Sequence, residues 1–440
     1  MTHRTSAFAI LAAVAAGAGS ASAYYYVDDF GKPTVTGLRT DDEFLTNGPF
    51  FSFVDPANFG PKAGLEDANP LGPDFRVGAG YGYDSNPWLR EDDWDVDSFY
   101  KSAYAQGSSI VRNMGTTTFL AGGANYTYYE RGQFDDQSAL DLDLRGGINH
   151  EFSEALRLVA MGRGDYGRHL PNHLGPIREG LQEDDVLRYY VNARADYRWD
   201  AQPLGSNGWQ ASTGGMLTGF DSRDTSAKEF ADFHRLGGQQ GIYYIVDPTL
   251  QAGVEGRFSR ADYRLENGLR NDSLDFVATV DGVLGSALTY HAEAGVQSRD
   301  YKSSMIKDRD EFYFMSKGTY EAGQNFFVSG MIFNGIEDRY NNSMDSHFFE
   351  PQVLKGGIVA NRDIGSVNFR SGFEAASVDG EIFGGSEDIK RYEASLGADW
   401  EVLFGRLSAT YSYTWGKADL SGSGYDFDRS RLYLNYQHDF

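Results

Sequence analysis

Hydrophobic and polar residues alternate one by one along most of the chain from Phe75 to Phe440. Because successive side chains of a β-strand point to opposite faces, each alternating run predicts a strand with one apolar and one polar face. Counting such runs gives about 18 strands, with about 16–18 compatible with the pattern. The clearest runs cover residues 75–83, 140–152, 187–199, 288–299, 392–400, 407–415 and 431–440.

Alternation is common to soluble β-sandwiches, whose apolar face points inward, and to membrane barrels, whose apolar face points outward. Three features favour the barrel. The runs extend over about ten residues or more, as a tilted membrane strand requires, whereas soluble strands usually have about five or six. Aromatic residues such as Trp199 and Trp415 stand at the ends of apolar faces, where membrane interfaces place them. Short connections alternate with long acidic ones, which is typical of periplasmic turns and external loops.

We therefore predict an all-β fold over residues 74–440, a transmembrane antiparallel up-and-down β-barrel. Its last strand would pair with its first and would end at the periplasmic membrane interface. The run 431–440 resembles the final strand of bacterial outer-membrane barrels, which commonly end in Phe. We interpret its apolar face as the signal for the barrel-assembly machinery and as a contact with outer-membrane lipid. That face consists of Leu432, Leu434, Tyr436 and Phe440.

The first 23 residues predict a secretory signal peptide. Arg4 stands near the start, an apolar run covers 7–18, and Ala21-Ser22-Ala23 provides a small-residue cleavage site. No later apolar stretch approaches the roughly 18 residues of a membrane helix, and the absence of cysteine excludes a disulfide framework or a lipid anchor. We place the protein in the cell outer membrane of a Gram-negative bacterium.

Residues 24–73 lack strand alternation and are rich in Pro, Gly and Asp. Phe44, Phe50, Phe51 and Phe53 cluster within this segment. We expect it to form an N-terminal periplasmic arm or a plug in the lumen.

The net charge of −24 argues against nucleic acid as a partner. The polar faces of the strands carry both signs. A lining of one sign would filter ions of the other, whereas a mixed lining suits hydrated, hydroxyl-rich solutes. The alternative is that these residues pair with one another across the wall. The predicted pore-lining residues are Asp141, Asp143, Arg145, Arg157, Arg163, Arg188, Arg194, Asp196, Arg198, Glu255, Arg257, Glu293, Arg299, Arg370, Glu374 and Glu393.

Metal binding and catalysis are only weakly indicated. Asp93, Asp95 and Asp97 would offer carboxylate oxygens to calcium, but the run lacks the glycine and closing glutamate of an EF-hand loop, so a solvated loop is favoured. No Gly-x-Ser-x-Gly elbow or His-Glu-x-x-His motif occurs. We interpret His291 with Glu293 as a hydrogen-bonded pair. We expect neither an enzyme nor a bound cofactor.

The run Gly80-Tyr81-Gly82-Tyr83-Asp84-Ser85-Asn86-Pro87 ends the first predicted strand in strong turn chemistry. Here the chain resembles the β-barrel porin type 2 family of outer-membrane proteins. That family is similar in its signal peptide, its Gly-x-x-Tyr-Asp-Ser-Asn-like strand end, its acidic loops and its terminal Phe strand. The resemblance covers the barrel, and the long segment 24–73 departs from the family, whose first strand follows the signal peptide more closely.

We expect a monomeric, water-filled channel, and the resemblance implies that it serves as a conduit for exopolysaccharide secretion. Its partners would be the polysaccharide passenger and a periplasmic polysaccharide-export protein. Two alternatives stay open, namely a general or sugar-uptake diffusion porin and a plugged structural or adhesive surface barrel.

Overall fold

The computed structural model describes the strands and several of their connections. The predicted signal peptide (1–23), the predicted arm or plug (24–73) and the candidate calcium ligands Asp93, Asp95 and Asp97 lie outside the described residues. The described residues are 74–85, 98–113, 115–130, 139–167, 186–222, 233–247, 249–263, 270–284, 288–302, 307–321, 326–336, 352–382, 385–402, 405–420 and 423–439.

Eighteen strands make up the described fold. The shortest has 11 residues and the longest 18, which is long enough for a tilted strand to cross a bilayer. In the described part of the chain no helix is long and apolar enough to span a membrane. The strands are β1 (Asp74–Asp84), β2 (Ser98–Asn113), β3 (Thr116–Tyr129), β4 (Ala139–Ser153), β5 (Leu156–Gly167), β6 (Val186–Tyr197), β7 (Gly208–Ser222), β8 (Phe233–Asp247), β9 (Leu250–Tyr263), β10 (Asn271–Leu284), β11 (Leu288–Tyr301), β12 (Arg309–Glu321), β13 (Phe326–Ile336), β14 (Gln352–Ile364), β15 (Val367–Ile382), β16 (Gly385–Val402), β17 (Gly405–Leu420) and β18 (Ser423–Asp439).

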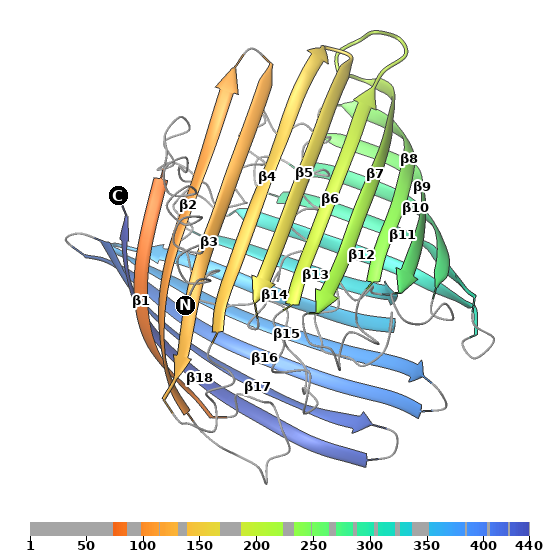
Figure 1. Ribbon diagram of the computed structural model, residues 1–440. Coiled ribbons are helices and arrows are strands. Elements are labelled where there is room, and N and C mark those ends of the chain that lie inside the picture. The colour runs from red at the N-terminus through yellow and green to blue at the C-terminus, as the bar shows by residue number, and fades with distance from the viewer. Residues whose placement is uncertain are drawn as a thin grey trace, which may run out of the picture.

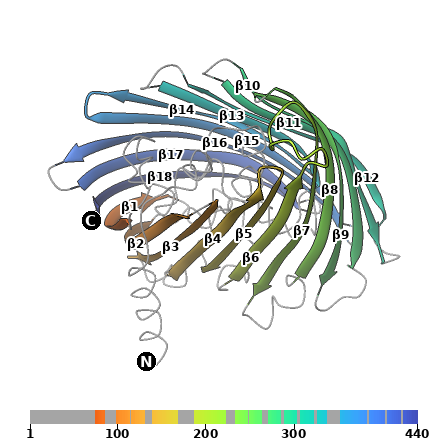
Figure 2. The ribbon, with the colours of Figure 1, turned by 90° about the horizontal axis from the view of Figure 1, so that it is seen from above.

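Each strand pairs antiparallel with its neighbours in the chain, and β1 also pairs with β18. The 18-stranded sheet therefore closes on itself (Figure 1, Figure 2). In the closing pair, Tyr81 lies opposite Leu434 and Tyr83 opposite Leu432. A closed sheet leaves no unpaired edge in the bilayer. The predicted up-and-down barrel and the pairing of its first and last strands are confirmed.

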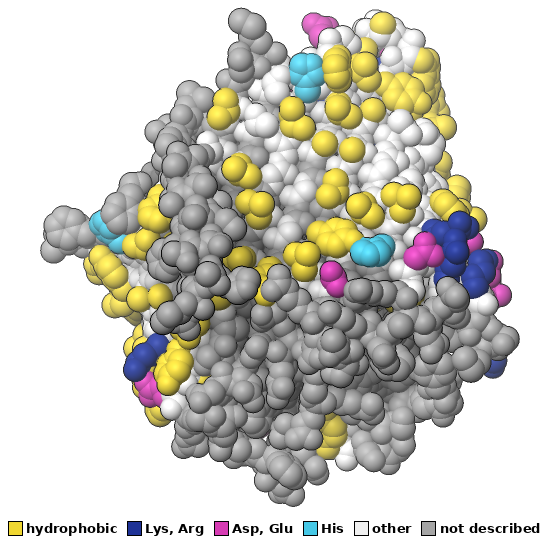
Figure 3. Space-filling model, in the orientation of Figure 1, with side chains coloured by type: hydrophobic (Ala, Val, Ile, Leu, Met, Phe, Trp, Pro, Cys, Tyr) yellow, Lys and Arg dark blue, Asp and Glu magenta, His cyan; other side chains and the backbone are white. Residues whose placement is uncertain are grey.

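The two faces of the sheet differ in chemistry. Large apolar side chains such as Leu144, Phe276 and Leu396 are exposed on the outer face, at 49%, 62% and 64%. The alternate positions point inward and are buried and largely polar, as at Gln251 and Asp399. This is the reverse of a water-soluble protein, and an apolar outer face is what lipid requires. The protein is therefore an outer-membrane protein. Figure 3 shows hydrophobic side chains spread over the strands, with Lys and Arg gathered at the margins.

Connections are mostly short at one end of the barrel, where 198–207 is the exception, and mostly long at the other. The short end includes residues 154–155 and 365–366, whereas 168–185 and 337–351 connect strands at the opposite end. The expected alternation is wrong for the last two connections at the long end, because β15 and β16 are joined by two residues, as are β17 and β18. These four strands have 16 to 18 residues each. These four strands therefore continue as sheet at the end of the barrel where most other strands are joined by long loops.

The closing seam is fastened on its inner side by tyrosines that lie over glycines. Three seam glycines alternate along β1, and a Cβ on any of them would overlap a tyrosine ring of β2 or β18. The rings therefore occupy space that only glycine leaves free. The pairs are Gly78 with Tyr104, Gly80 with Tyr433 and Gly82 with Tyr100.

Hydrogen bonds hold the same tyrosines in place. Tyr433 and Ser102 share a hydrogen bond of 2.6 Å across β1. Tyr104 donates to Gln437 Oε1 over 3.1 Å and accepts from Asn435 Nδ2 over 2.9 Å. β2 and β18 are thus linked directly, over the glycine face of the strand between them.

Asp84 and Ser85 complete this seam. Asp84 is fully buried, Arg429 Nε donates to its Oδ1 over 2.8 Å, and Arg431 Nε lies 3.3 Å from Oδ2. The Ser85 N–H donates to Ser430 O over 3.0 Å, and the Ser430 N–H donates to Ser85 Oγ over 2.7 Å. The Asp-Ser pair that was predicted as turn chemistry therefore also joins the first strand to the last.

Replacing Gly80 by Leu tests the seam. The new side chain would overlap the Tyr433 ring, and we expect a loss of about 1–3 kcal/mol in stability, the usual cost of overpacking. Urea unfolding of the detergent-folded barrel, followed by heat-dependent mobility on gels, measures the effect. Gly256→Leu is the matched control, because no atom lies within 4 Å of a Cβ there. Equal stability of the two variants would contradict the role of the seam.

Candidate functional site

The inner wall of the barrel is the candidate functional site, because it carries the predicted pore-lining residues. The side chains of Asp141, Asp143, Arg145, Arg163 and Arg188 lie outside the described part, although their strands β4, β5 and β6 are described. The other predicted wall residues, apart from Arg198, are buried or half-buried at inward positions of their strands. They are Arg157, Arg194, Asp196, Glu255, Arg257, Glu293, Arg299, Arg370, Glu374 and Glu393.

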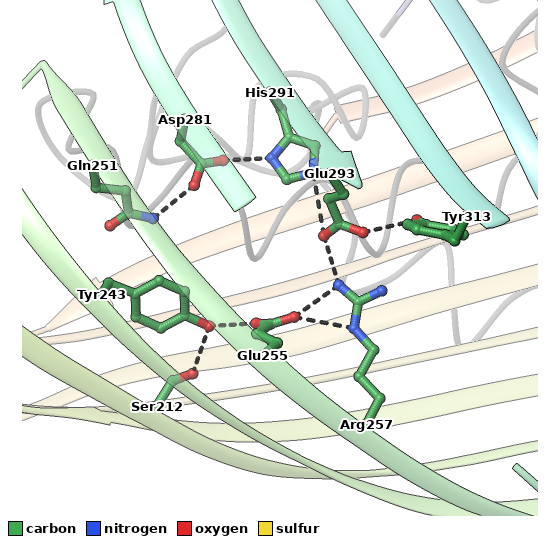
Figure 4. A network of polar contacts seen from close by, with 9 residues as sticks. All are labelled: Ser212, Tyr243, Gln251, Glu255, Arg257, Asp281, His291, Glu293 and Tyr313. Carbon is green, nitrogen blue, oxygen red and sulfur yellow. Dashed lines mark hydrogen bonds and ion pairs between the residues drawn. The ribbon is translucent and has the colours of Figure 1, made fainter. Parts of the chain in front are cut away.

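A network of polar contacts centres on Arg257 of β9 (Figure 4). Its Nη2 donates to Glu255 Oε2 over 2.7 Å and to Glu293 Oε1 of β11 over 2.5 Å. Tyr313 of β12 donates to the other oxygen of Glu293 over 2.7 Å, and Tyr243 of β8 donates to Glu255. One guanidinium thus links two carboxylates, each of which is also bound by a tyrosine of a further strand.

His291 extends the network along β10 and β11. Its Nδ1 shares a hydrogen bond with Asp281, and its Nε2 lies 3.4 Å from Glu293 Oε1. Gln251 Nε2 of β9 donates to the second oxygen of Asp281 over 2.8 Å. His291 therefore bridges two carboxylates, and no Ser or Thr hydroxyl among the described residues forms a hydrogen bond with it. The expected pairing of His291 with Glu293 is confirmed as a contact. The geometry is that of a structural link between side chains of the barrel wall.

A second group of charges lies on β5 and β6. Asp196 is 1% exposed and stands between two arginines. Arg157 Nη2 lies 2.9 Å from Asp196 Oδ2, and Arg194 Nε lies 3.0 Å from Oδ1. Two cations around one anion give this sector of the wall a local positive charge.

Pairs continue around the wall. Arg370 Nη2 of β15 lies 2.7 Å from Asp399 Oδ1 of β16. Arg391 Nη2 lies 2.7 Å from Glu393 Oε2, and its Nη1 is 4.0 Å from Glu374 Oε1. Opposite charges are therefore held together on neighbouring strands here as well.

Sequence reasoning missed Arg235, Asp275, Arg391 and Asp399, although it predicted most of the other described charges on the wall. Arg235 is 2% exposed on β8, and its Nη1 donates to Ser259 Oγ over 2.9 Å. It was overlooked because β8 contains the run Gly237-Gly238, which interrupts the alternation. The neighbour Leu236 is 67% exposed, and its phase would have placed Arg235 inward.

Arg198 was predicted to line the pore, but the structure places it just beyond β6, in the connection to β7. Its Nε donates to Asp200 Oδ1 over 2.9 Å, and Nη1 donates to Ser206 Oγ over 2.7 Å. Nη2 donates to Asn207 O over 3.1 Å. Hydrogen bonds from Arg198 lower the pKa of the Asp200 carboxyl. Arg198 therefore fastens this connection.

The described charges differ in balance between neighbouring sectors. On β5 to β8 the arginines Arg157, Arg194 and Arg235 outnumber the single carboxylate Asp196. On β9 to β11 the carboxylates outnumber the arginines. The residues of that acidic sector are Glu255, Arg257, Asp275, Asp281, Glu293 and Arg299, with Arg299 Nη1 2.6 Å from Asp275 Oδ1. The arrangement offers a solute both signs of charge, each already bound to a partner.

The predicted assembly signal lies on the outer face of β18. Leu432, Leu434 and Tyr436 are 45%, 48% and 43% exposed, and Phe440 lies outside the described residues. Their contact with lipid follows from this exposure, whereas recognition by the assembly machinery stays a prediction. No cluster of three or more metal-ligating side chains occurs in the described ranges, which do not include the candidate calcium ligands.

The chain resembles several solved structures in its fold, although its sequence identity to them is low. No protein-family model and no curated protein matches the chain. The outer membrane protein opdK of Pseudomonas aeruginosa is 12% identical, with a TM-score of 0.43 over 84% of this chain and 99% of that one.

Two further solved structures also match this chain at low sequence identity. Pseudomonas aeruginosa OccK2 (OpdF) in complex with glucuronate is 12% identical, with a TM-score of 0.46 over 84% of this chain and 98% of that one. The FrpB iron transporter of Neisseria meningitidis is 9% identical, with a TM-score of 0.38 over 84% and 82%. The fold and its membrane are established by the closed sheet and its apolar outer face, independently of these likenesses.

Replacing Arg257 by Met tests the central network. It leaves Glu255 and Glu293 buried without their shared cation, and we expect a loss of about 3–5 kcal/mol in stability. Urea unfolding of the reconstituted barrel, followed by tryptophan fluorescence, measures it. Arg260→Met is the matched control on the same strand, because Arg260 is exposed with Asp272 on the outer face and should matter little. Equal unfolding midpoints would refute the importance of the network.

Proposed function

We propose that the protein is a passive, water-filled outer-membrane channel for hydrated, hydroxyl-rich solutes. The observation that carries this proposal is the reversal of faces, with exposed apolar side chains outside and buried charges of both signs inside. Polar groups inside a barrel do not contact lipid, and they favour a lumen that is filled with water. A wall that carries both signs disfavours a filter for ions of one charge.

We further propose a secreted polysaccharide as the passenger. Support comes from the resemblance at Gly80–Pro87 and from the paired state of the wall charges. A carboxylate already bound to an arginine, as in Arg257 with Glu293, has less electrostatic attraction left for a passing polymer. Many weak hydrogen bonds along such a wall would let a neutral or weakly charged polymer slide without being trapped. A periplasmic export protein would deliver it.

Ion selectivity in planar bilayers tests the channel. We expect stepwise conductance with weak selectivity between potassium and chloride. Replacing Arg157 and Arg194 together by Gln removes two wall cations, leaves Asp196 unbalanced and should shift selectivity toward potassium. Arg260→Gln changes a charge of the outer face and should leave selectivity unchanged. Absence of any conductance from correctly folded barrel would exclude the channel.

Deleting the gene tests the passenger. We expect extracellular polysaccharide to fall severalfold, with polymer retained in the periplasm, because the outer membrane would then lack its conduit. Expression of the intact chain should restore secretion. Normal polymer yield together with slower growth on a sugar would instead establish the uptake alternative.

A further inference from the structure

An apolar patch interrupts the polar inner wall on strands β14 to β18. Strand register places Val353 opposite Val378, and Val378 opposite Ile389. Ile389 lies in turn opposite Ala418, so the apolar row is continuous across neighbouring strands. The inner apolar patch comprises Val353, Ala376, Val378, Ile389, Ala418 and Phe427, with Phe333 and Tyr425 packed against it.

The inner apolar patch faces the inside of the barrel and is covered. Ile389 shares its strand face with Arg391, whereas Tyr392 is exposed at 37% on the outer face. Val353 and Val378 have no exposed area. Phe333 and Tyr425 pack against the patch, and leaving apolar side chains in water would cost about 25 cal/mol for each Å². The near-complete burial of the row therefore favours a further group that lies on the patch.

Arg391 borders the patch and has donors to offer such a group. It lies opposite Ala376 and is 2% exposed. One nitrogen binds Glu393, but Nε and Nη1 have no hydrogen-bond acceptor among the described residues. Buried donors are nearly always paired, and backbone carbonyls of a docked chain segment would provide acceptors.

Residues 44–54 have the chemistry that fits this patch. Their sequence, FLTNGPFFSFV, contains four phenylalanines and no charged residue, in a chain of which 23% is charged. The segment precedes β1, so it belongs to none of the described strands. An exposed stretch of this kind would form an apolar surface that proteins in water avoid.

The segment is long enough to reach the patch. Roughly twenty residues separate Phe53 from the start of β1, and an extended chain of that length spans up to about 70 Å. β1 pairs with β18, where Arg76 lies opposite Asp439. Phe427 lies about 40 Å farther along β18, at roughly 3.3 Å per residue. The linker therefore covers the distance from inside the barrel.

We propose that residues 44–54 dock on the inner apolar patch within the lumen. The phenylalanines cover the row from Val353 to Ala418, and backbone carbonyls accept hydrogen bonds from Arg391. This assignment goes beyond the proposed function and does not depend on which solute passes.

Cysteine protection in the full mature chain tests the docking. The chain contains no cysteine, so Ala418→Cys introduces a single thiol, at a site that is 2% exposed. We expect slow reaction with a polar maleimide. Adding Phe50→Ser, Phe51→Ser and Phe53→Ser should accelerate labelling roughly tenfold, because the cover is lost. Unchanged labelling would overturn the proposal, and so would fast labelling before the serine substitutions.

A matched control distinguishes the other apolar segment near the patch. Phe348→Ser with Phe349→Ser alters the connection 337–351 and should leave the thiol protected. Fast labelling in this control alone would assign the cover to that connection and overturn the proposal. Heat-dependent gel mobility confirms that each variant is a folded barrel.

A photo-crosslinker provides a measurement that does not depend on the serine variants. Benzoylphenylalanine in place of Phe427 should form adducts that map to residues 44–54. Adducts confined to any other segment would overturn the docking. Neither readout requires transport, so failure of the docking is distinguishable from failure of the proposed channel.

Discussion

Closure of the sheet is the constraint on which the rest of the structure depends. In hydrocarbon a backbone N–H or C=O without a partner costs several kcal/mol, so a strand with an open edge is not viable. The chain meets this condition only when β1 pairs with β18. The seam tyrosines over β1 and the ion pair of Asp84 with Arg429 strengthen that joint. These contacts connect the two ends of the barrel sequence.

Once the sheet is closed, the polar face of every strand has only the interior to occupy. Charges that point there leave bulk water, and a buried charge is tolerated when a partner and hydrogen bonds accompany it. Arg257 between Glu255 and Glu293 meets that requirement across β9 and β11. The networks therefore hold neighbouring strands together, and they leave the wall with paired charges of both signs.

The inner apolar patch is an exception to this rule, because its buried, inward-facing side chains are apolar. Apolar side chains on a wet wall are unfavourable unless something covers them. Charges surround the patch, with Arg391 directly beside Ala376. A docked apolar segment would resolve this conflict.

Alternation along the chain determined the strands, their number and the face that each residue presents, because the period of two is a local property of the backbone. Leu434 and Tyr436 were placed on lipid correctly for that reason. Only the tertiary structure decided which charges meet, as with Glu255 and Glu293, because register and closure depend on pairing between distant segments. The apolar row from Val353 to Ala418 also depends on that pairing, and no local pattern records it.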